Sequence, residues 1–506
     1  MIPRRIISRD IGERNRDIIN DIISSVIRLI RRNLMTTSRI TELVELLDKS
    51  VVMINDSFEV KDRNHLRKNI HKLAEIASLG SNPDKALAQY IIRKVALAVG
   101  AVPSSIINLY LARGRGEIPF SFTVPAINLR MLAFDSARMV FKVAKRLNAG
   151  AFIFEIARSE MGYTDQRPAE YSSSVLAAAI EEDYVGPIFI QGDHFQVSAK
   201  RYATGPDTEI DAIKDLIREA LAAGFYNIDI DTSTMVDMTK QTVPEQQKVN
   251  YSLSAMFSAF IRSTQPKNIQ VSIGGEIGEV GGHNSTEEEL RSYMDGYNSE
   301  LANNQPNTVG LSKISIQTGT SHGGVVLPDG SIAKVSLDFD ILKKLSQVAR
   351  SSYGMGGTVQ HGASTLPDTA FGKFVESEAV EVHLATNFQN MIYDRIPDGL
   401  RSEMYTFLDQ NNASDRKPEM TDEQFYYKTR KYAVGPFKEK TWKLSESTKN
   451  DITLALEKQF HRLFTDLGMR DTRIYVDKYI QPVSINPSLK EYLGENVAEE
   501  VSDLAD

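Results

Sequence analysis

Three of the eight histidines share one setting, because each directly follows a β-rich run and stands beside or close to glycine. They are His194, His322 and His361. The chain has no cysteine, which excludes disulfides, thiolate nucleophiles and cysteine-based metal sites. Three imidazoles that leave a fourth position open are typical of a catalytic zinc ion, so we predict a Zn²⁺ site. The alternative is three hydrogen-bonded histidines without a metal.

Carboxylates accompany these histidines. Asp193 immediately precedes His194, and Asp231 and Glu276 follow two other β-rich runs. A carboxylate beside a metal-bound substrate oxygen can act as general base and acid, which makes Asp193 the catalytic candidate. Its alternative role is to orient a histidine. Asp231 and Glu276 are predicted either to hold a second divalent metal ion or to orient the histidines.

Glycines and small polar residues follow the later runs. Gly323 and residues 362–364 permit close backbone approach and expose N–H groups, while Thr386 follows the last run. Barrel enzymes often bind phosphate in the loops after the seventh and eighth strands, which is where Ser364 and Thr386 are expected. Glycine also makes ordinary turns, so this signal alone is weak.

The elements that must position these residues are eight short β-rich runs that alternate with helical stretches. The runs span residues 118–124, 151–156, 187–191, 226–230, 268–273, 313–318, 357–360 and 379–384. Eight strand–helix alternations predict parallel strands that close into a (β/α)₈ TIM barrel, an α/β fold whose active site lies at the C-terminal strand ends. A doubly wound sheet is the alternative, but no glycine-rich fingerprint follows the first run.

The regions on either side of the predicted barrel have a helical sequence pattern with few strand signals. Residues 1–110 are predicted to form a helical N-terminal extension, residues 111–395 the barrel, and residues 396–506 a mostly helical C-terminal extension. Isoleucines recur at helical spacing between residues 18 and 30. We expect this face to be buried against the main body of the protein or a neighbouring subunit, and we favour a homo-oligomer. The acidic tail, Glu495–Asp506, is predicted to be disordered.

Composition narrows the class of protein. The formal net charge is −7 and no large basic block occurs, which argues against nucleic acid as the main partner. No uninterrupted apolar run approaches the ~20 residues needed to cross a bilayer. Charges interrupt the first residues throughout, unlike a secretory signal. We therefore expect a cytoplasmic protein without a membrane partner.

Six motifs, taken together and in order, resemble the class II, metal-dependent fructose-bisphosphate aldolase family. They are Gln191–Gln196, Asn227–Ser233, Glu276–Gly282, Gly319–Gly323, His361–Ser364 and Ala385–Asn387. Pro125–Asn128 and the pair Ser159 and Glu160 resemble the first two strand ends of that family. The resemblance spans roughly residues 110–395.

The resemblance implies zinc ligands at His194, His322 and His361, second-metal ligands at Asp231 and Glu276, and proton transfer by Asp193. The substrate and phosphate contacts that it implies are Ser159, Gly323, Gly362, Ala363, Ser364, His383, Ala385 and Thr386. The implied reaction is the reversible aldol cleavage of a phosphorylated ketose to a dihydroxyacetone phosphate-type product and an aldehyde, a step of carbohydrate metabolism such as glycolysis.

Several positions depart from the family pattern. Val325 and Val326 stand where the family often has a lysine, and His283 with Asn284 replaces acidic residues of the fifth loop. His283 is therefore the candidate for a proton-transfer loop. His383 stands where the family usually has Asn. These changes predict altered substrate recognition, including a ketose other than fructose 1,6-bisphosphate.

Two other functions stay open at this point. The changed loops and the extra helical region would suit a non-catalytic family relative that acts as a partner or regulatory subunit. Another metal-dependent barrel enzyme, such as a hydrolase or isomerase, is the third hypothesis. The absence of a His-x-His pair after the first strand counts against the common metallohydrolase arrangement.

Overall fold

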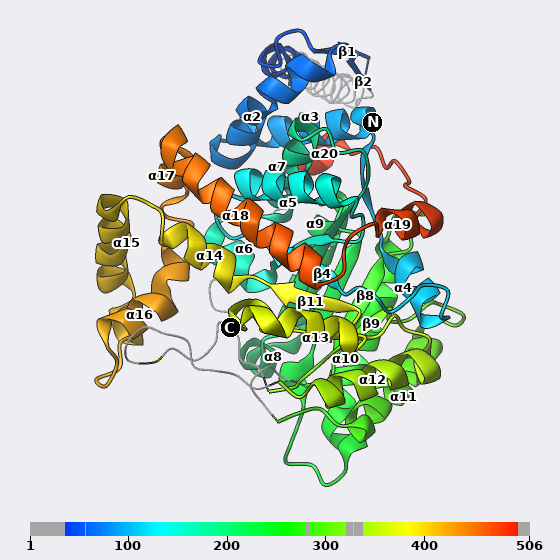
Figure 1. The fold of residues 1–506 in the computed structure, drawn as a ribbon. Coiled ribbons are helices and arrows are strands. Elements are labelled where there is room, and N and C mark those ends of the chain that lie inside the picture. The colour runs from blue at the N-terminus through cyan, green and yellow to red at the C-terminus, as the bar shows by residue number, and fades with distance from the viewer. Residues whose placement is uncertain (1–35, 56, 279–282, 320–326, 328–336, 494–506) are drawn as a thin grey trace, which may run out of the picture.

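The structure is a computed structural model that describes residues 36–55, 57–278, 283–319, 327 and 337–493 (Figure 1). Eight parallel strands lie at its centre. They are β4 (Val124–Asn128), β5 (Ile153–Ala157), β6 (Gly186–Gln196), β7 (Asn227–Asp231), β8 (Ser272–Glu276), β9 (Lys313–Ile316), β10 (Thr358–Gln360) and β11 (Glu381–Leu384). Each pairs with the next, and β11 pairs with β4, so the sheet closes. The predicted (β/α)₈ barrel is confirmed.

Amphipathic helices connect the strands and cover the barrel. The helices between successive strands are α5 (Ala133–Leu147), α6 (Arg158–Thr164), α7 (Pro168–Glu181), α8 (Ala199–Thr204), α9 (Pro206–Ala223), α10 (Val243–Thr264), α11 (Glu287–Asn304), α12 (Phe339–Tyr353) and α13 (Phe371–Glu376). In α5, residues such as Val140, Ala144 and Leu147 recur at helical spacing and are buried. This helix ends at Asn148, whose φ of 50° is the left-handed geometry of a helix stop.

The first barrel strand begins later than the sequence pattern predicts. Residues 118–124 were expected to form it, but β4 starts at Val124 and runs to Asn128. Ile118 and Phe122 are buried without strand pairing. Apolar content marks burial, whereas strand pairing needs a partner backbone, and β11 pairs only from Val124 onward.

The N-terminal region contains strands that the sequence analysis did not predict. β1 (Val51–Ile54) and β2 (Ser57–Val60) form an antiparallel hairpin with a two-residue connection. Asn55, which begins this connection, has a φ of 55°, a conformation that two-residue hairpin loops need. β3 (Ala101–Ser104) pairs in parallel with the first part of β6. Residues 1–35, including the isoleucine-rich stretch, lie outside the described residues.

Two long helices of this region dock on the barrel. α2 (Arg63–Leu79) and α3 (Asp84–Val99) pack on each other and on α7, and Figure 1 shows them beside the hairpin at the top of the molecule. The short helix α4 (Ile107–Gly114) follows β3. The extension is thus bound to the barrel by its helices, which supply the apolar surface that an isolated hairpin lacks.

The C-terminal region is helical, and it also packs on the barrel. Its helices are α14 (Thr386–Tyr393), α15 (Asp398–Asn411), α16 (Asp422–Thr429), α17 (Lys438–Trp442), α18 (Glu446–Asp466), α19 (Arg473–Tyr479) and α20 (Leu489–Tyr492). α18 packs on α5 and α14. The N–H of Thr123 donates to the carbonyl of Leu467 over 3.0 Å, which joins the segment after α18 to the entry of β4. The acidic tail lies outside the described residues.

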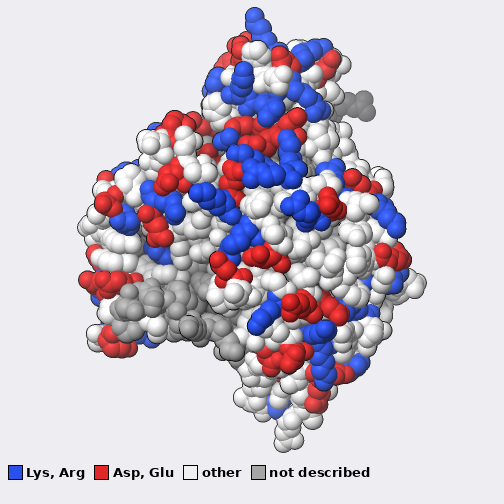
Figure 2. Space-filling view, in the orientation of Figure 1, with Lys and Arg blue, Asp and Glu red and all other residues white. Residues whose placement is uncertain are grey.

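The described surface carries both signs of charge. Figure 2 shows basic and acidic side chains interleaved over one face of the molecule, without a broad field of a single sign. Among the described residues, no helix combines the length and the apolar character that a bilayer-spanning segment requires.

Candidate active site

The candidate site lies at the carboxyl ends of the barrel strands, where a strand irregularity presents two functional side chains side by side. The pairing of β6 with β7 shifts register between Gly192 and Phe195. Within that interval His194 has a φ of 40°, which is rare for a residue other than glycine. Bulges of this kind re-aim side chains next to active sites. Asp193 and His194 consequently make different contacts, as their adjacent positions near a strand end predicted.

Two histidines and a glutamate form a group that could hold a metal ion. His194 Nε2 and His361 Nδ1 stand 2.9 Å apart, and a Glu276 carboxylate oxygen completes a set whose ligand atoms all lie within 4.8 Å of one another. These three residues come from β6, the end of β10 and the end of β8. Imidazole and carboxylate are suitable ligands for a divalent transition metal, so the donor chemistry fits the metal that the sequence predicted.

Asp231 orients one of these histidines. Its Oδ2 lies 2.8 Å from His194 Nδ1, so that the other ring nitrogen of His194 faces His361. Asp231 in turn accepts hydrogen bonds from Ser233 and, over 2.8 Å, from the Gln196 side chain. A carboxylate that fixes the ring of a ligating histidine is a recurrent feature of metal sites. His322 and Gly323, predicted as zinc ligand and phosphate contact, lie outside the described residues.

The electrostatics of this group favour a bound cation. Burial alone would lower the pKa of His194, but the charges of Asp193 and Glu276 and the hydrogen bond to Asp231 raise it well above its usual value. Burial, reinforced by the charge of Asp231, raises the pKa of Glu276 to about 7. Buried carboxylates that stabilise a proton here would also stabilise a divalent cation.

Asp193 is held by hydrogen bonds to both carboxylate oxygens. Asn128 donates to Oδ2 over 3.0 Å, and His383 Nδ1 lies 3.1 Å from Oδ1. Burial would raise the pKa of Asp193, but the neighbouring charges of His194 and then His383 lower it well below its usual value. The direction of this shift favours the ionised carboxylate, which is the form that a general base requires.

A charged layer lies beneath the site, where TIM barrels usually have branched apolar side chains. The buried Nζ of Lys313 donates over 2.8 Å each to Asp229 and Gln191, and it also pairs with Glu381. His383 Nε2 lies 2.6 Å from Glu381, so this layer connects directly to Asp193.

This charged layer was not predicted from the sequence, although a signal for it was present. Glu155, Asp229, Lys313 and Glu381 all fall within the β-rich runs, where a charge at a buried strand position is unusual. Burial, together with the charges of Asp193 and Glu381, raises the pKa of Glu155 well above its usual value.

The structure brings together the residues predicted to contact phosphate that follow β10 and β11. Gly362 has a φ of 67°, which allows the chain to turn directly after His361. The N–H of Ala385 donates to Ser364 Oγ, so that the loop after β10 is bonded to the end of β11. Thr386, half-buried, begins α14. Ala363 is buried in the same short turn.

Three other predicted residues have different settings. His383 is buried with both ring nitrogens facing carboxylates, below the strand ends. Ser159 is half-buried in the first turn of α6. His283 lies on the approach to α11 with a side chain that is 56% exposed, and its Nε2 is 2.6 Å from Glu289. Their predicted roles in substrate contact and proton transfer stay predictions.

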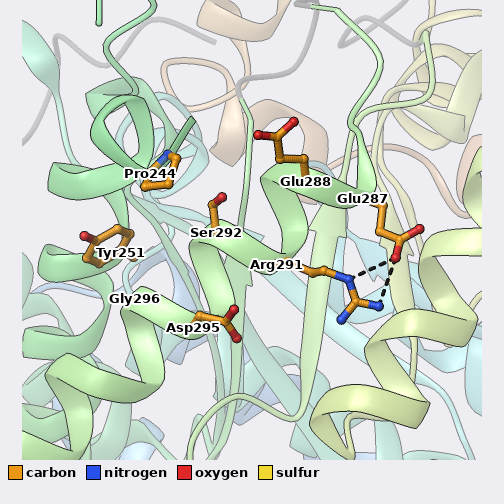
Figure 3. A pocket seen from close by; sticks show the side chains of 8 residues that line it. All are labelled: Pro244, Tyr251, Glu287, Glu288, Arg291, Ser292, Asp295 and Gly296. Atoms are coloured by element: carbon orange, nitrogen blue, oxygen red, sulfur yellow. Dashed lines mark hydrogen bonds and ion pairs between the residues drawn. The ribbon is translucent and has the colours of Figure 1, made fainter. Parts of the chain in front are cut away.

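A separate surface groove does not contain any of these residues. It has a volume of about 540 Å³ and lies along α10 and α11, lined by residues such as Pro244, Tyr251 and Asp295. Figure 3 shows that the side chain of Arg291 in this groove forms an ion pair with Glu287. Among the described residues, no group of side chains that could hold a metal ion lies in this groove, so the candidate site is the one at the strand ends.

The chain matches a known protein family. The family model for class II fructose-bisphosphate aldolase matches residues 120–454. No curated protein sequence matches the chain.

Solved structures that match the chain share little sequence with it. The YdjI aldolase from Escherichia coli K12 is 12% identical, with a TM-score of 0.43 over 72% of this chain and 98% of its own. A probable tagatose 6 phosphate kinase from Sinorhizobium meliloti 1021 is 14% identical, with a TM-score of 0.49 over 70% of this chain and 100% of its own. The fructose-bisphosphate aldolase from Campylobacter jejuni is 18% identical, with a TM-score of 0.41 over 72% and 94%.

The family match covers most of the chain, including every barrel strand and every described residue of the candidate site. It also extends past the predicted barrel boundary at residue 395 into α18. The chain belongs to the class II fructose-bisphosphate aldolase family.

Proposed function

We propose that the protein is a zinc-dependent lyase that catalyses the reversible aldol cleavage of a phosphorylated ketose resembling fructose 1,6-bisphosphate. The observation that carries the proposal is the juxtaposition of a metal-ligating group with an ionised carboxylate. Asp193 Oδ1 lies 3.7 Å from the Nε2 of His194, the nitrogen that faces His361. A base next to a Lewis-acid position is what aldol cleavage requires.

The residues that would hold the zinc ion are His194 and His361 together with His322. Glu276 and Asp231 lie beside them, either as ligands of a second divalent ion or as groups that orient the histidines. A divalent cation bound there supplies Lewis-acid stabilisation of the negative charge that develops on the ketose oxygens.

Asp193 performs the proton transfer in this proposal. Its carboxylate accepts the proton of the hydroxyl at C4, the C4–O group becomes the aldehyde carbonyl, and the C3–C4 bond breaks with its electron pair left on the ketone fragment. Asn128 and His383 keep the carboxylate in one orientation through bonds of 3.0 and 3.1 Å, so the base is positioned before the substrate binds. In the reverse direction the C3–C4 bond forms, and the protonated Asp193 returns its proton to the former aldehyde oxygen, which becomes the C4 hydroxyl.

The phosphate group of the ketose is proposed to bind where the loops after β9, β10 and β11 meet. Gly323, Gly362, Ser364 and Thr386 are the proposed contacts, with Ala363 and Ala385 contributing backbone. Ser159 and His383 stay predicted substrate contacts, although the ring nitrogens of His383 are already engaged by Asp193 and Glu381. A homo-oligomer and a cytoplasmic location also stay predictions, which size-exclusion chromatography and cell fractionation would check.

Metal removal is the first test. Purified protein is expected to cleave fructose 1,6-bisphosphate in an assay coupled to triose-phosphate detection, to lose this activity on chelation, and to regain it with Zn²⁺ but not with Mg²⁺. The reason is that the histidine-containing ligand set suits zinc better than a hard, oxygen-preferring ion. Metal content measured before and after chelation provides the control.

Absence of turnover in zinc-loaded protein on this substrate moves the test to other ketose phosphates. If every ketose phosphate is left intact by the zinc-loaded protein, the aldolase proposal is wrong. A stable complex with a catalytic relative would then favour the regulatory-subunit alternative.

His283 gives a more specific prediction. We expect His283→Gln to slow the exchange of dihydroxyacetone phosphate protons with solvent deuterium by about tenfold or more, because a general acid–base group typically contributes 10²–10⁴-fold. NMR of the ketone phosphate in deuterated buffer measures this half-reaction without the aldehyde. Glu289→Gln, which removes the partner of His283 but no proton-transfer group, is the matched control. Unchanged exchange in His283→Gln would remove His283 from the reaction.

A further inference from the structure

One arginine at the mouth of the barrel contacts Thr386, a residue of the proposed phosphate site. Arg130 follows β4 by two residues, and its Nη1 lies 3.4 Å from Thr386 Oγ1 and 3.5 Å from Gln389 Oε1. Its side chain is 13% exposed, so that a bound ligand can reach it. The guanidinium therefore joins the first strand of the barrel to the beginning of α14, which follows the last strand.

The position of this guanidinium is fixed by a buried carboxylate, Glu160. Arg130 Nε donates to Glu160 Oε1 over 2.6 Å, and Glu160 Oε2 accepts from Asn128 Nδ2 and from the N–H of Ala157. Glu160 is buried and is held by two donors besides Arg130, so it anchors the Nε side of the guanidinium. An arginine held in this way keeps its planar donors in one orientation, which lowers the entropy lost on binding an anion.

Arg130 places a cation beside proposed phosphate contacts that carry no charge themselves. Gly362, Ser364 and Thr386 are uncharged, and Asp193, Asp231 and Glu276 place carboxylates at the same strand ends. Positive charge next to these contacts favours the binding of a phosphate ester. Lys313 does not provide it, because its Nζ is buried below the site and paired with Asp229 and Glu381.

We propose that Arg130 binds the phosphate ester of the substrate and selects phosphorylated over unphosphorylated ketoses. This inference rests on the proposed function for the identity of the ligand. Guanidinium donors match phosphate oxygens in pairs, whereas Thr386 and Ser364 offer single hydroxyl donors. Asn128 bonds both Glu160 and Asp193, so the residue that anchors Arg130 and the catalytic base share one support.

Calorimetry on the zinc-loaded protein tests this assignment without requiring turnover. The probes are inorganic phosphate and dihydroxyacetone phosphate. Arg130→Met is expected to weaken the binding of both by at least tenfold, since it removes a charge-assisted contact. Arg130→Lys is expected to restore part of the affinity because it keeps the charge but loses the planar donors. The zinc affinity of each variant, measured in phosphate-free buffer, should equal that of the wild type.

Two further variants make the result decisive. Arg138→Met removes an arginine that also pairs with carboxylates, those of Glu181 and Glu182, but on the outside of the barrel, and it should leave phosphate binding unchanged. The double variant Arg130→Met with Glu160→Gln removes both charges, so that no unpaired buried carboxylate remains if the single variant fails to fold.

Folded Arg130→Met protein that binds phosphate within twofold of the wild type would overturn the proposal, as would equal loss in Arg138→Met. Arg130-dependent phosphate binding without cleavage of any ketose phosphate would support this assignment while contradicting the lyase function. The two failures are therefore distinguishable.

Discussion

Asp193→Asn is expected to lower kcat for ketose phosphate cleavage by about 10²–10⁴-fold, the range for loss of a general acid–base group. Asparagine nearly matches aspartate in shape but cannot accept the C4 hydroxyl proton. Its amide can still bond to Asn128 or His383, which hold the carboxylate at 3.0 and 3.1 Å in the wild type. Steady-state kinetics, with zinc content measured on the same sample, would give the result.

A second aspartate separates loss of the base from loss of the metal. Asp231 bonds to His194 Nδ1 over 2.8 Å, so Asp231→Asn should reduce zinc affinity by 10–100-fold, the typical cost of losing such a partner, and excess zinc should restore much of its activity. Excess zinc should not restore Asp193→Asn. Wild-type turnover in Asp193→Asn, or its rescue by zinc, would show that Asp193 is not the proton-transfer residue.

The sequence predicted the barrel and the strand-end positions because both depend on local pattern. β-rich runs that alternate with helices determine the topology, and the topology alone brings residues that follow separate strands to one end. His194, His361, Asp231 and Glu276 could be grouped for that reason before any distance was known. Their contacts of 2.8–3.3 Å are consistent with that grouping.

Other features depend on partners that are distant in sequence. The irregularity at His194 arises from the pairing of β6 with β7, which no local pattern reveals. In the sequence, Arg130 is a charged residue after a short strand and gives no sign of a functional role. Its contact with Thr386, which lies 256 residues further along the chain, depends on the fold. The hairpin of β1 and β2 is a different case, because a local turn signal was present: Asn55 lies between two four-residue strands. The helical pattern of the surrounding sequence led us to expect helices there instead.

The charged layer beneath the site gives the largest expected effect on stability. Lys313→Met should lower the free energy of unfolding by about 3–5 kcal/mol, because it leaves Asp229 and Glu381 buried without their shared cation. Methionine nearly preserves the volume of the side chain, so the effect reports charge rather than a cavity. The midpoint of urea unfolding, followed by circular dichroism, measures the change.

Two further variants test whether the loss of stability comes from the unpaired carboxylates. Lys142→Met removes an exposed lysine that pairs with Glu457, and it should change stability by less than about 1 kcal/mol. Adding Glu381→Gln to Lys313→Met should recover part of the loss, since one of the unpaired carboxylates is removed. If Lys313→Met unfolds at the wild-type urea concentration, the layer is not held together by this cation.

The charged layer also affects catalysis, because Glu381 contacts His383, which holds Asp193. Any Lys313→Met protein that folds should therefore have a lower kcat and an unchanged zinc affinity. The reason is that the substitution displaces the base, Asp193, but does not displace the metal ligands.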